Sequence, residues 1–232
     1  MTVQVGQCGN QMGLKFWDLA LQEHASSHKL DPKTGLPLVE EAFTSFFQPM
    51  DARASTFSKS LPVGAPFSSC RARAIIIDME EGVIQHKLQG GKLGELFDPN
   101  LIVSDKPGCG NNWGQGFHEF GEKYHTEILD KMQKAAEACD SLQGFFFMHS
   151  LGGGTGSGLG TYTLSRITAD NFKKELKFST CVFPSEDDDV NVSPYNCLLA
   201  LNELIESPDC VLPIDNQALF DMVAKVENKI SA

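Results

Sequence analysis

A glycine-rich segment lies between an apolar run and a helical pattern and has the sequence Ser150-Leu151-Gly152-Gly153-Gly154-Thr155-Gly156-Ser157-Gly158. Glycines at such a junction let backbone N–H groups approach a phosphate without a Cβ atom in the way, and the following helix adds a favourable dipole. No lysine is close in the sequence, so the binding would rest on backbone amides alone. A flexible linker is the alternative, but glycine-rich linkers seldom join a buried strand to a helix. We therefore expect a phosphate-binding loop.

Two common nucleotide-binding motifs do not match this segment. The dinucleotide fingerprint G-x-G-x-x-G fails because its third glycine would fall on Ser157, Leu159 or Thr161. The P-loop motif G-x-x-x-x-G-K-[ST], whose lysine contacts the β- and γ-phosphates, occurs nowhere in the chain. The loop must therefore belong to another phosphate-binding class.

The whole chain of 232 residues is acidic, with a formal net charge of -11 and a pI near 4.9. This balance argues against nonspecific binding to nucleic acid or to an anionic membrane, because both depend on basic patches. Seven scattered cysteines without a C-x-x-C pair indicate a reducing compartment rather than a disulfide or zinc framework. No secretory signal and no apolar run of roughly 20 residues is present, so we expect a soluble, cytoplasmic protein.

Strand and helix patterns alternate along the chain and position the glycine segment. An α/β fold with a mainly parallel sheet and helices on both faces follows from this alternation, and ligands of such folds lie beyond the carboxyl ends of the strands. A long loop is expected over residues 26–69, and residues 1–232 are expected to form one domain. The expected strands span residues 2–5, 74–78, 144–149, 178–183 and 211–212, and the expected helices span 10–25, 116–139, 159–167, 195–205 and 216 onward.

The segment GGGTGSG at residues 152–158 resembles the signature of the tubulin and FtsZ superfamily. Residues 6–11, with the sequence GQCGNQ, resemble the first nucleotide loop of eukaryotic tubulins. The resemblance extends over essentially the whole chain through residues 78–80, 108–113, 193–196 and 214–219. Within the family, residues 16–21, 183–189 and 212–217 look most like the epsilon branch.

This resemblance implies a Rossmann-like GTPase domain that binds GTP or GDP together with Mg²⁺. It implies that Gly6, Gln7, Cys8 and Gln11 approach the phosphates and the ribose. The residues that would surround the phosphates are Ser150, Gly153, Gly154, Thr155 and Gly156.

Glu80, with Asp78 beside it, is the candidate for organising the magnesium ion. Hard cations choose carboxylate oxygens, and an acid near a triphosphate would repel it unless a cation lay between them. An N-cap or a solvated surface acid is the alternative interpretation of Glu80.

Three further residues follow from the resemblance, each with an ordinary alternative. Asn111 would donate its amide to the γ-phosphate or belong only to a turn. Asp189 would contact the ribose or lie in a solvated acidic run. Asn216 would bind the guanine edge through its paired donor and acceptor, or cap the final helix.

The sequence departs from conventional tubulins at Ser193, where they place a glutamate, and the loop before it is one residue shorter. These differences fall where the resemblance places the ribose contacts. The resemblance also places an aromatic base stack, a second asparagine and the interface acid for hydrolysis beyond Ala232. We therefore expect this chain alone to bind nucleotide, to hydrolyse it poorly and not to polymerise.

The resemblance implies a cytoskeletal protein of microtubules, or of centrosomes, centrioles and basal bodies, whose partners are other tubulins. A relict interaction module that binds no nucleotide, or an unrelated α/β nucleotide hydrolase, are the alternatives. Against a hydrolase of another class, the chain has no nucleophile–base motif and its histidines follow no ligand spacing.

Overall fold

The computed structural model describes residues 1–26, 45–49, 70–85, 90–91, 93–185, 188 and 190–230. Within this part of the chain a six-stranded sheet has the order β5-β4-β1-β6-β7-β8, and every neighbouring pair is parallel. The strands are β1 (Thr2–Val5), β4 (Ala74–Asp78), β5 (Ile102–Ser104), β6 (Gly144–Ser150), β7 (Leu176–Phe183) and β8 (Cys210–Asp215). The α/β fold expected from the alternating pattern is confirmed.

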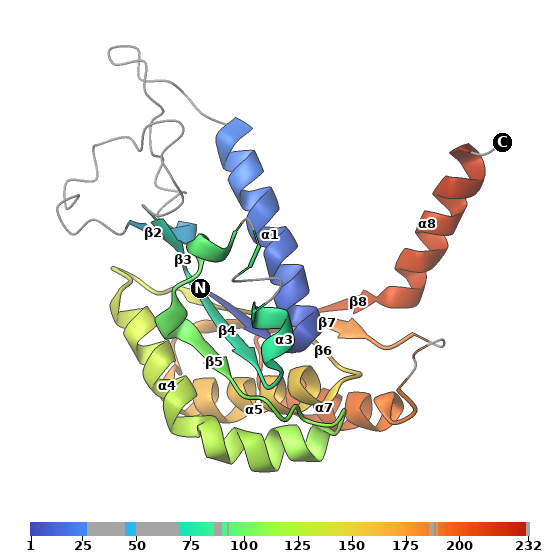
Figure 1. The fold of residues 1–232 in the computed structure, drawn as a ribbon. Helices are drawn as coiled ribbons and strands as arrows, with labels where there is room; N and C mark the ends of the chain where they lie inside the picture. Colours follow the sequence, from blue (N-terminus) through green and yellow to red (C-terminus); the bar gives the residue numbers. More distant parts are fainter. Residues whose placement is uncertain are drawn as a thin grey trace, which may run out of the picture.

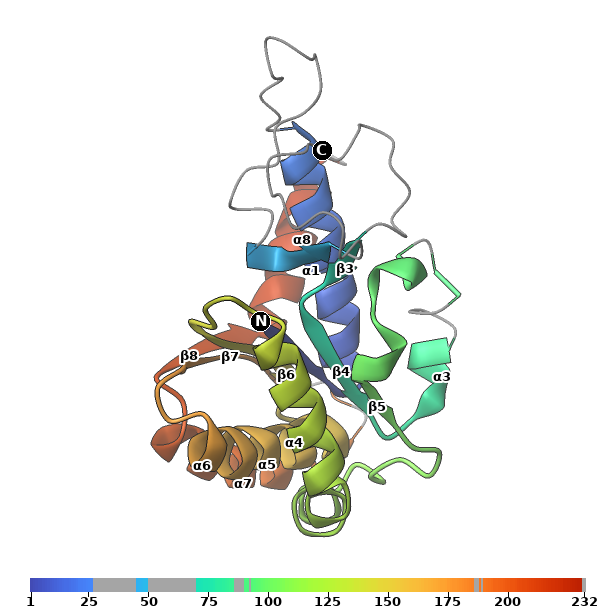
Figure 2. The same cartoon turned by 90° about the vertical axis from the view of Figure 1, so that its left-hand side faces the viewer.

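Helices cover both faces of the sheet (Figure 1). On one face lie α1 (Gly6–Ser26) and α8 (Asn216–Ile230), which extends away from the sheet, and the turned view in Figure 2 separates them from the helices of the other face. The other face carries α4 (Gly121–Glu137), α5 (Gly160–Tyr162), α6 (Ala169–Asn171) and α7 (Ser193–Glu206). The helical turn η5 (Gln115–Phe120) leads into α4, η6 (Thr155–Leu159) leads into α5, and η7 (Thr163–Thr168) joins α5 to α6.

The smaller elements lie near β4 and β5. Strands β2 (Phe47–Pro49) and β3 (Cys70–Ala72) form an antiparallel pair. The short helix α3 (Glu81–Val83) follows β4, and the turns η3 (Gly94–Leu96) and η4 (Pro99–Leu101) precede β5.

The order of the strands reverses between β1 and β6. From β1 the chain adds β4 and β5 on one side, and from β6 it adds β7 and β8 on the other. Connections that leave β1 and β6 therefore diverge, and this opens a crevice beyond their carboxyl ends.

The sheet is buried on both faces, which explains the continuous apolar run of β4. Ile75 and Ile77 belong to the larger core cluster, which includes Ile128 of α4, whereas Ile76 belongs to the cluster around Trp17 of α1. The two clusters hold the carboxyl end of β4 at a fixed depth beneath the crevice.

The element boundaries differ from the expected ones at several points. Helix α1 begins at Gly6 rather than residue 10, and the helical segment after the glycine loop begins at Thr155 rather than residue 159. Strand β8 is longer than the expected pair of residues because it pairs with β7 along its whole length. Most of the expected loop over residues 26–69 lies outside the described residues, but Phe47 in it is buried in β2.

None of the described helices is long and apolar enough to span a membrane.

Candidate functional site

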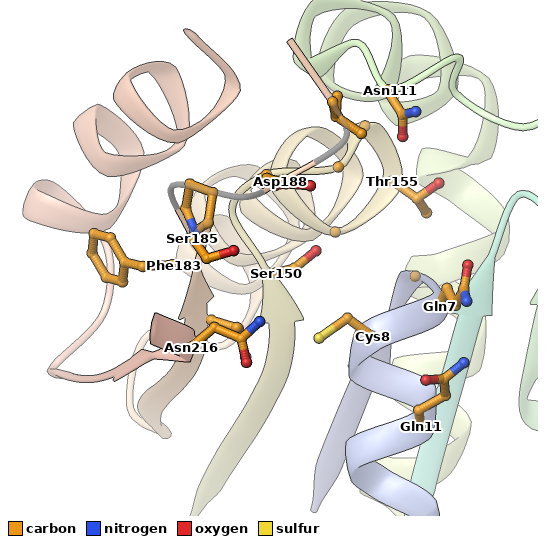
Figure 3. A pocket seen from close by; sticks show the side chains of 18 of the residues that line it. Gln7, Cys8, Gln11, Asn111, Ser150, Thr155, Phe183, Ser185, Asp188 and Asn216 are labelled. Atoms are coloured by element: carbon orange, nitrogen blue, oxygen red, sulfur yellow. The ribbon is translucent and has the colours of Figure 1, made fainter. Parts of the chain in front are cut away.

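A cavity of about 700 Å³ lies at the carboxyl ends of the central strands, in the crevice where the strand order reverses. Small-molecule sites typically occupy about 300–1,000 Å³. Figure 3 shows side chains from the first turn of α1, the glycine loop, the end of β7 and the start of α8 around this space. The sequence-predicted residues that line it are Gly6, Gln7, Cys8, Gln11, Asp78, Glu80, Asn111, Ser150, Gly153, Gly154, Thr155, Gly156 and Asn216. Asp189 lies outside the described residues.

The glycine loop packs directly on the turn that contains Cys109 and Asn112. A Cβ atom on Gly154 would lie 2.6 Å from the backbone nitrogen of Asn112 and 2.8 Å from the Cβ of Cys109. A Cβ atom on Gly153, in contrast, would have no heavy atom nearer than 3.7 Å. Gly154 is therefore required by packing against the protein, whereas Gly153 leaves space in the cavity itself.

The first turn of α1 lies against the same loop. Gly6 has a φ of +74°, and a Cβ atom on it would lie 3.0 Å from the backbone nitrogen of Gly156. This close approach places Gln7 and Cys8 near the glycine loop, and Gln11 lines the cavity one turn further along α1 (Figure 3). Burial raises the pKa of the Cys8 thiol, so Cys8 contributes a neutral group to the wall.

The cavity wall carries acidic residues but no basic ones. Among the described lining residues there is no lysine or arginine, whereas Asp78, Glu80 and Asp188 are all present. His149, directly before the loop, is fully buried; burial lowers its pKa to about 4, and its Nε2 lies 2.8 Å from Ser179 Oγ. An anionic ligand would therefore depend on backbone amides and on a cation from solution.

Asp78 and Glu80 differ in their environments. Asp78 is 2% exposed, and its carboxylate accepts hydrogen bonds from Asn10 Nδ2 at 3.4 Å and from the backbone N–H of Glu80 at 3.3 Å. Burial raises the pKa of Asp78 to about 6. Glu80 is exposed and occupies the N-cap position of α3, but its side chain makes no capping hydrogen bond there.

The described residues contain no group of three or more His, Cys, Asp or Glu side chains placed to hold a metal ion. A magnesium ion does not require such a group, because it usually keeps several waters and takes one or two carboxylates together with phosphate oxygens. An exposed Glu80 backed by a fixed Asp78 fits that requirement.

Asn216 begins α8 and lies across the cavity from Cys8 (Figure 3). Asp215 accepts hydrogen bonds from the backbone N–H groups at the start of this helix. Its Oδ1 lies 2.9 Å from Gln217 N and 3.3 Å from Ala218 N. The helix is thus capped by Asp215 and not by Asn216. The capping alternative for Asn216 was wrong, and its amide remains available to a ligand.

Asp188 lines the cavity in the region where the sequence had suggested Asp189. Ser193 is 1% exposed, and its hydroxyl lies 2.9 Å from Asp188 Oδ2 and 3.3 Å from the carbonyl oxygen of Gly152. The hydroxyl therefore holds Asp188 beside the glycine loop.

Sequence reasoning also missed Phe183, Gln217 and Phe220, which line the cavity around Asn216. The shortened loop before Ser193 could have indicated Asp188 instead of Asp189, since a one-residue deletion changes which acid faces the cavity. No spacing marked the two phenylalanines, because aromatic residues at strand ends and on helices are ordinary core residues.

Comparisons with known proteins agree with this architecture. The model of the Tubulin/FtsZ family, GTPase domain, matches residues 1–224. The chain is 50% identical over 227 residues to the tubulin epsilon chain of Mus musculus, covering 98% of this chain and 46% of the relative. It is 48% identical over 232 residues to the tubulin epsilon chain of Homo sapiens, covering 100% of this chain and 47% of the relative.

Identity to the tubulin beta-1 chain of Homo sapiens is lower, at 35% over 221 residues, covering 95% of this chain and 45% of the relative. The similarity to epsilon chains noted in the sequence is therefore confirmed. The chain spans about half the length of the curated relatives it matches.

Proposed function

Because the chain belongs to the Tubulin/FtsZ family, whose GTPase-domain model matches residues 1–224, we propose that its cavity binds a guanine nucleotide, GTP or GDP. One observation carries the proposal: the described candidate residues, which are far apart in the sequence, line a single cavity at the strand-order reversal. The expected place for a ligand in such a sheet is this crevice.

In this proposal the phosphates lie over the glycine loop. Backbone N–H groups of residues 153–156 donate to the phosphate oxygens, with Gln7, Gln11 and the hydroxyls of Ser150 and Thr155 around them. The supporting observation is the open space at Gly153 beside the start of a helical segment. Helix N-termini favour anions through free N–H groups and the dipole.

Mg²⁺ is proposed to bind between Glu80 and the terminal phosphates. Glu80 would supply a carboxylate oxygen, and Asp78 would orient the waters that the ion keeps. When bound, the ion would neutralise negative charge on the phosphates, which otherwise face acidic side chains. Asn111 is proposed to contact the terminal phosphate, because its side chain projects beside the loop (Figure 3).

The base is proposed to lie between α1 and the start of α8. The Asn216 amide offers one acceptor and two donor hydrogens, and these groups can pair with an N–H and an acceptor atom on the edge of guanine. Phe183 and Phe220 lie at the same end of the cavity and offer apolar contact to the base. Asp188, rather than Asp189, is proposed to accept a hydrogen bond from a ribose hydroxyl.

Two measurements test this proposal. Guanine nucleotide released after denaturing the purified protein would be identified by chromatography, and affinity would be measured by displacement of a fluorescent GTP analogue. We expect unlabelled GTP to displace the analogue at far lower concentration than ATP. Equal displacement by the two nucleotides would remove the guanine assignment.

A cytoskeletal role with other tubulins as partners is proposed from the similarity to epsilon chains. The proposed locations are microtubules, centrosomes, centrioles or basal bodies. We also propose that hydrolysis by one subunit is slow, because family resemblance implies that a neighbouring subunit supplies the acid that positions water. The rate of phosphate release would be measured at several protein concentrations. Rapid release whose rate per subunit does not change with protein concentration would contradict that proposal.

A further inference from the structure

The side chain of Asn196 connects two separate segments of the site, the turn at residues 111–113 and the glycine loop. It lies in the first turn of α7 and is 4% exposed. Its Oδ1 accepts a hydrogen bond from the backbone N–H of Trp113 at 2.9 Å. Its Nδ2 donates to the carbonyl oxygen of Asn111 at 2.8 Å and to that of Gly152 at 2.8 Å.

These bonds use the full donor capacity of the amide. A primary amide has two N–H donors, and here each reaches a carbonyl in a different loop. Asparagine and glutamine alone carry such a group, and glutamine is one methylene longer. Asn196 is therefore matched to its place in both length and chemistry.

The turn around Asn111 needs an external partner to keep its shape. Gly110 and Asn111 both have a φ of +51°, and Asn111 is the only non-glycine residue with positive φ in the described part of the chain. A left-handed conformation is less favourable for a residue with a side chain than the right-handed one. The bond from Asn196 to the carbonyl of Asn111 holds this conformation in place.

The same turn borders the glycine loop. Asn111 Oδ1 would lie 3.9 Å from a Cβ atom on Gly153, and Gly154 packs on the backbone of Asn112. Asn196 bonds to Gly152 at the start of that loop and to Asn111 on the facing turn. The two walls are thus held at a fixed separation by one buried side chain.

We propose that Asn196 is a positioning residue that clamps the Asn111 turn onto the glycine loop and so sets the affinity for the terminal phosphates of the nucleotide. The inference rests on the proposed guanine-nucleotide site. Asn196 does not line the cavity and acts through the two walls, so its effect must depend on how many phosphates the ligand carries.

The test replaces Asn196 by aspartate, which has the same shape. Asn196→Asp keeps an acceptor for the N–H of Trp113 but loses both donors and directs a carboxylate at the carbonyls of Asn111 and Gly152. The matched control is Asn202→Asp, because Asn202 lies on the exposed side of the same helix and its change adds the same charge.

Dissociation constants for GTP, GDP and GMP would be measured for both variants and the unaltered protein, alongside the midpoint of thermal unfolding. For Asn196→Asp we expect GTP binding to weaken at least about tenfold and GMP binding to change less than about threefold. Asn202→Asp should change neither. A purely structural role would weaken all three nucleotides by one factor, and that result, or unchanged GTP binding, would overturn the inference.

A second measurement keeps the inference testable without nucleotide. Hydrogen exchange of the segment 109–115 should be faster in Asn196→Ser than in the unaltered protein, because Ser is too short to span both carbonyls. Equal exchange would refute the clamp. If the unaltered protein bound no guanine nucleotide but exchange was still faster in Asn196→Ser, the proposed function alone would fail. If Asn196→Asp did not fold, Asn196→Ser would replace it in the nucleotide titrations.

Discussion

At the scale of single residues, the glycine loop contains two adjacent glycines with different requirements. A Cβ atom on Gly154 would collide with Asn112 and Cys109, whereas one on Gly153 would enter open space. We expect Gly154→Ala to lower the free energy of unfolding by about 1–3 kcal/mol through overpacking. We expect Gly153→Ala to leave that free energy unchanged and to weaken GTP binding at least about tenfold, since it narrows the phosphate position.

Urea unfolding and GTP titration of the two variants check this contrast. If Gly153→Ala retained full affinity, the phosphates would not lie over Gly153. A stable Gly154→Ala protein would show that the Asn112 turn yields without strain.

The pKa of Asp78 predicts how stability depends on pH. Burial raises this pKa to about 6 from 3.8, so between these values the folded protein holds a proton that the unfolded chain has lost. Stability therefore falls as pH rises through this window, and the loss is complete above about pH 6. Asp78→Asn should remove this dependence and, without Mg²⁺, raise the free energy of unfolding at neutral pH by on the order of 2–3 kcal/mol.

Asp105→Asn is the control with the opposite sign. A hydrogen bond from Lys123, with another from Tyr124, lowers the pKa of Asp105 to about 2, so its ionised form stabilises the folded state above pH 3.8. Asp105→Asn should therefore destabilise the protein at neutral pH. The free energy of unfolding of both variants and the unaltered protein would be measured in urea from pH 4 to 8 in the presence of a chelator. If it changed with pH in the same way in Asp78→Asn as in the unaltered protein, Asp78 would not be the source of the pH dependence.

Asp188 and Asp189, two of the acids that follow β7, are alternative candidates for the ribose contact. Loss of a ribose contact should weaken GTP binding about 5- to 30-fold while leaving 2′,3′-dideoxy-GTP unaffected. We expect this result for Asp188→Asn, because Asp188 lines the cavity, and unchanged binding for Asp189→Asn. Competition titrations with both nucleotides would distinguish the two acids, and the reverse pattern would restore the original choice of Asp189.

The chemistry of the site could be predicted because its residue types are unusual: consecutive glycines after a buried strand, and acids at another strand end. The roles of Asn216 and Glu80 could not be settled from sequence, because Asn, Asp and Glu are all common at helix starts. Only the geometry shows that Asp215 accepts the N–H groups of α8. The clamp by Asn196 depends on bonds to residues 83–85 positions away in sequence, at Trp113 and Asn111, which no local pattern reveals.

At the scale of elements, helix α1 lies unusually close to the sheet. A Cβ atom on Gly9 would lie 2.1 Å from the carbonyl oxygen of Met148 in β6, so α1 would have to move away from the sheet to accommodate it. This contact holds the first turn of α1 at the strand-order reversal. We expect Gly9→Ala to lower the free energy of unfolding by about 3 kcal/mol.

Gly82→Ala is the matched control for Gly9→Ala, because Gly82 is also helical and no heavy atom lies within 4 Å of a Cβ placed there. Its unfolding midpoint should stay close to that of the unaltered protein. Similar midpoints for the two variants in denaturant titrations would show that α1 can move away from β6 at little cost.

The central strands were predictable because β4 and β6 are continuous apolar runs that only a doubly covered sheet buries. Their ends were harder to predict. Helix α1 begins at Gly6, earlier than its apolar periodicity indicated, because its first turn is polar and faces the cavity instead of the core. Strand β8 is partly exposed, so its apolar pattern is weak although its pairing with β7 is complete.

At the scale of the whole molecule, electrostatics oppose the proposed ligand. The chain carries a formal net charge of -11, and the described cavity wall holds three acids and no basic residue. Two unit charges of the same sign 4 Å apart repel by about 4 kcal/mol at an effective dielectric constant of 20. Backbone amides offset part of this repulsion, but they carry only partial charges. A divalent cation is therefore expected to decide whether a triphosphate binds.

Removal of this cation should affect ligands in proportion to their negative charge. Chelating Mg²⁺ should weaken GTP binding at least about 100-fold, GDP binding less, and guanosine binding not at all, because repulsion grows with the number of phosphates. Glu80→Gln should reduce the difference between the GTP affinities measured with Mg²⁺ and with chelator. The change removes both a charge that repels the phosphates and the carboxylate proposed to coordinate Mg²⁺. Glu81→Gln, next to it in α3 and absent from the cavity lining, is the control and should behave like the unaltered protein. Titrations with and without chelator measure these ratios, and equal GTP affinity under both conditions would show that the amides alone overcome the charge of the molecule.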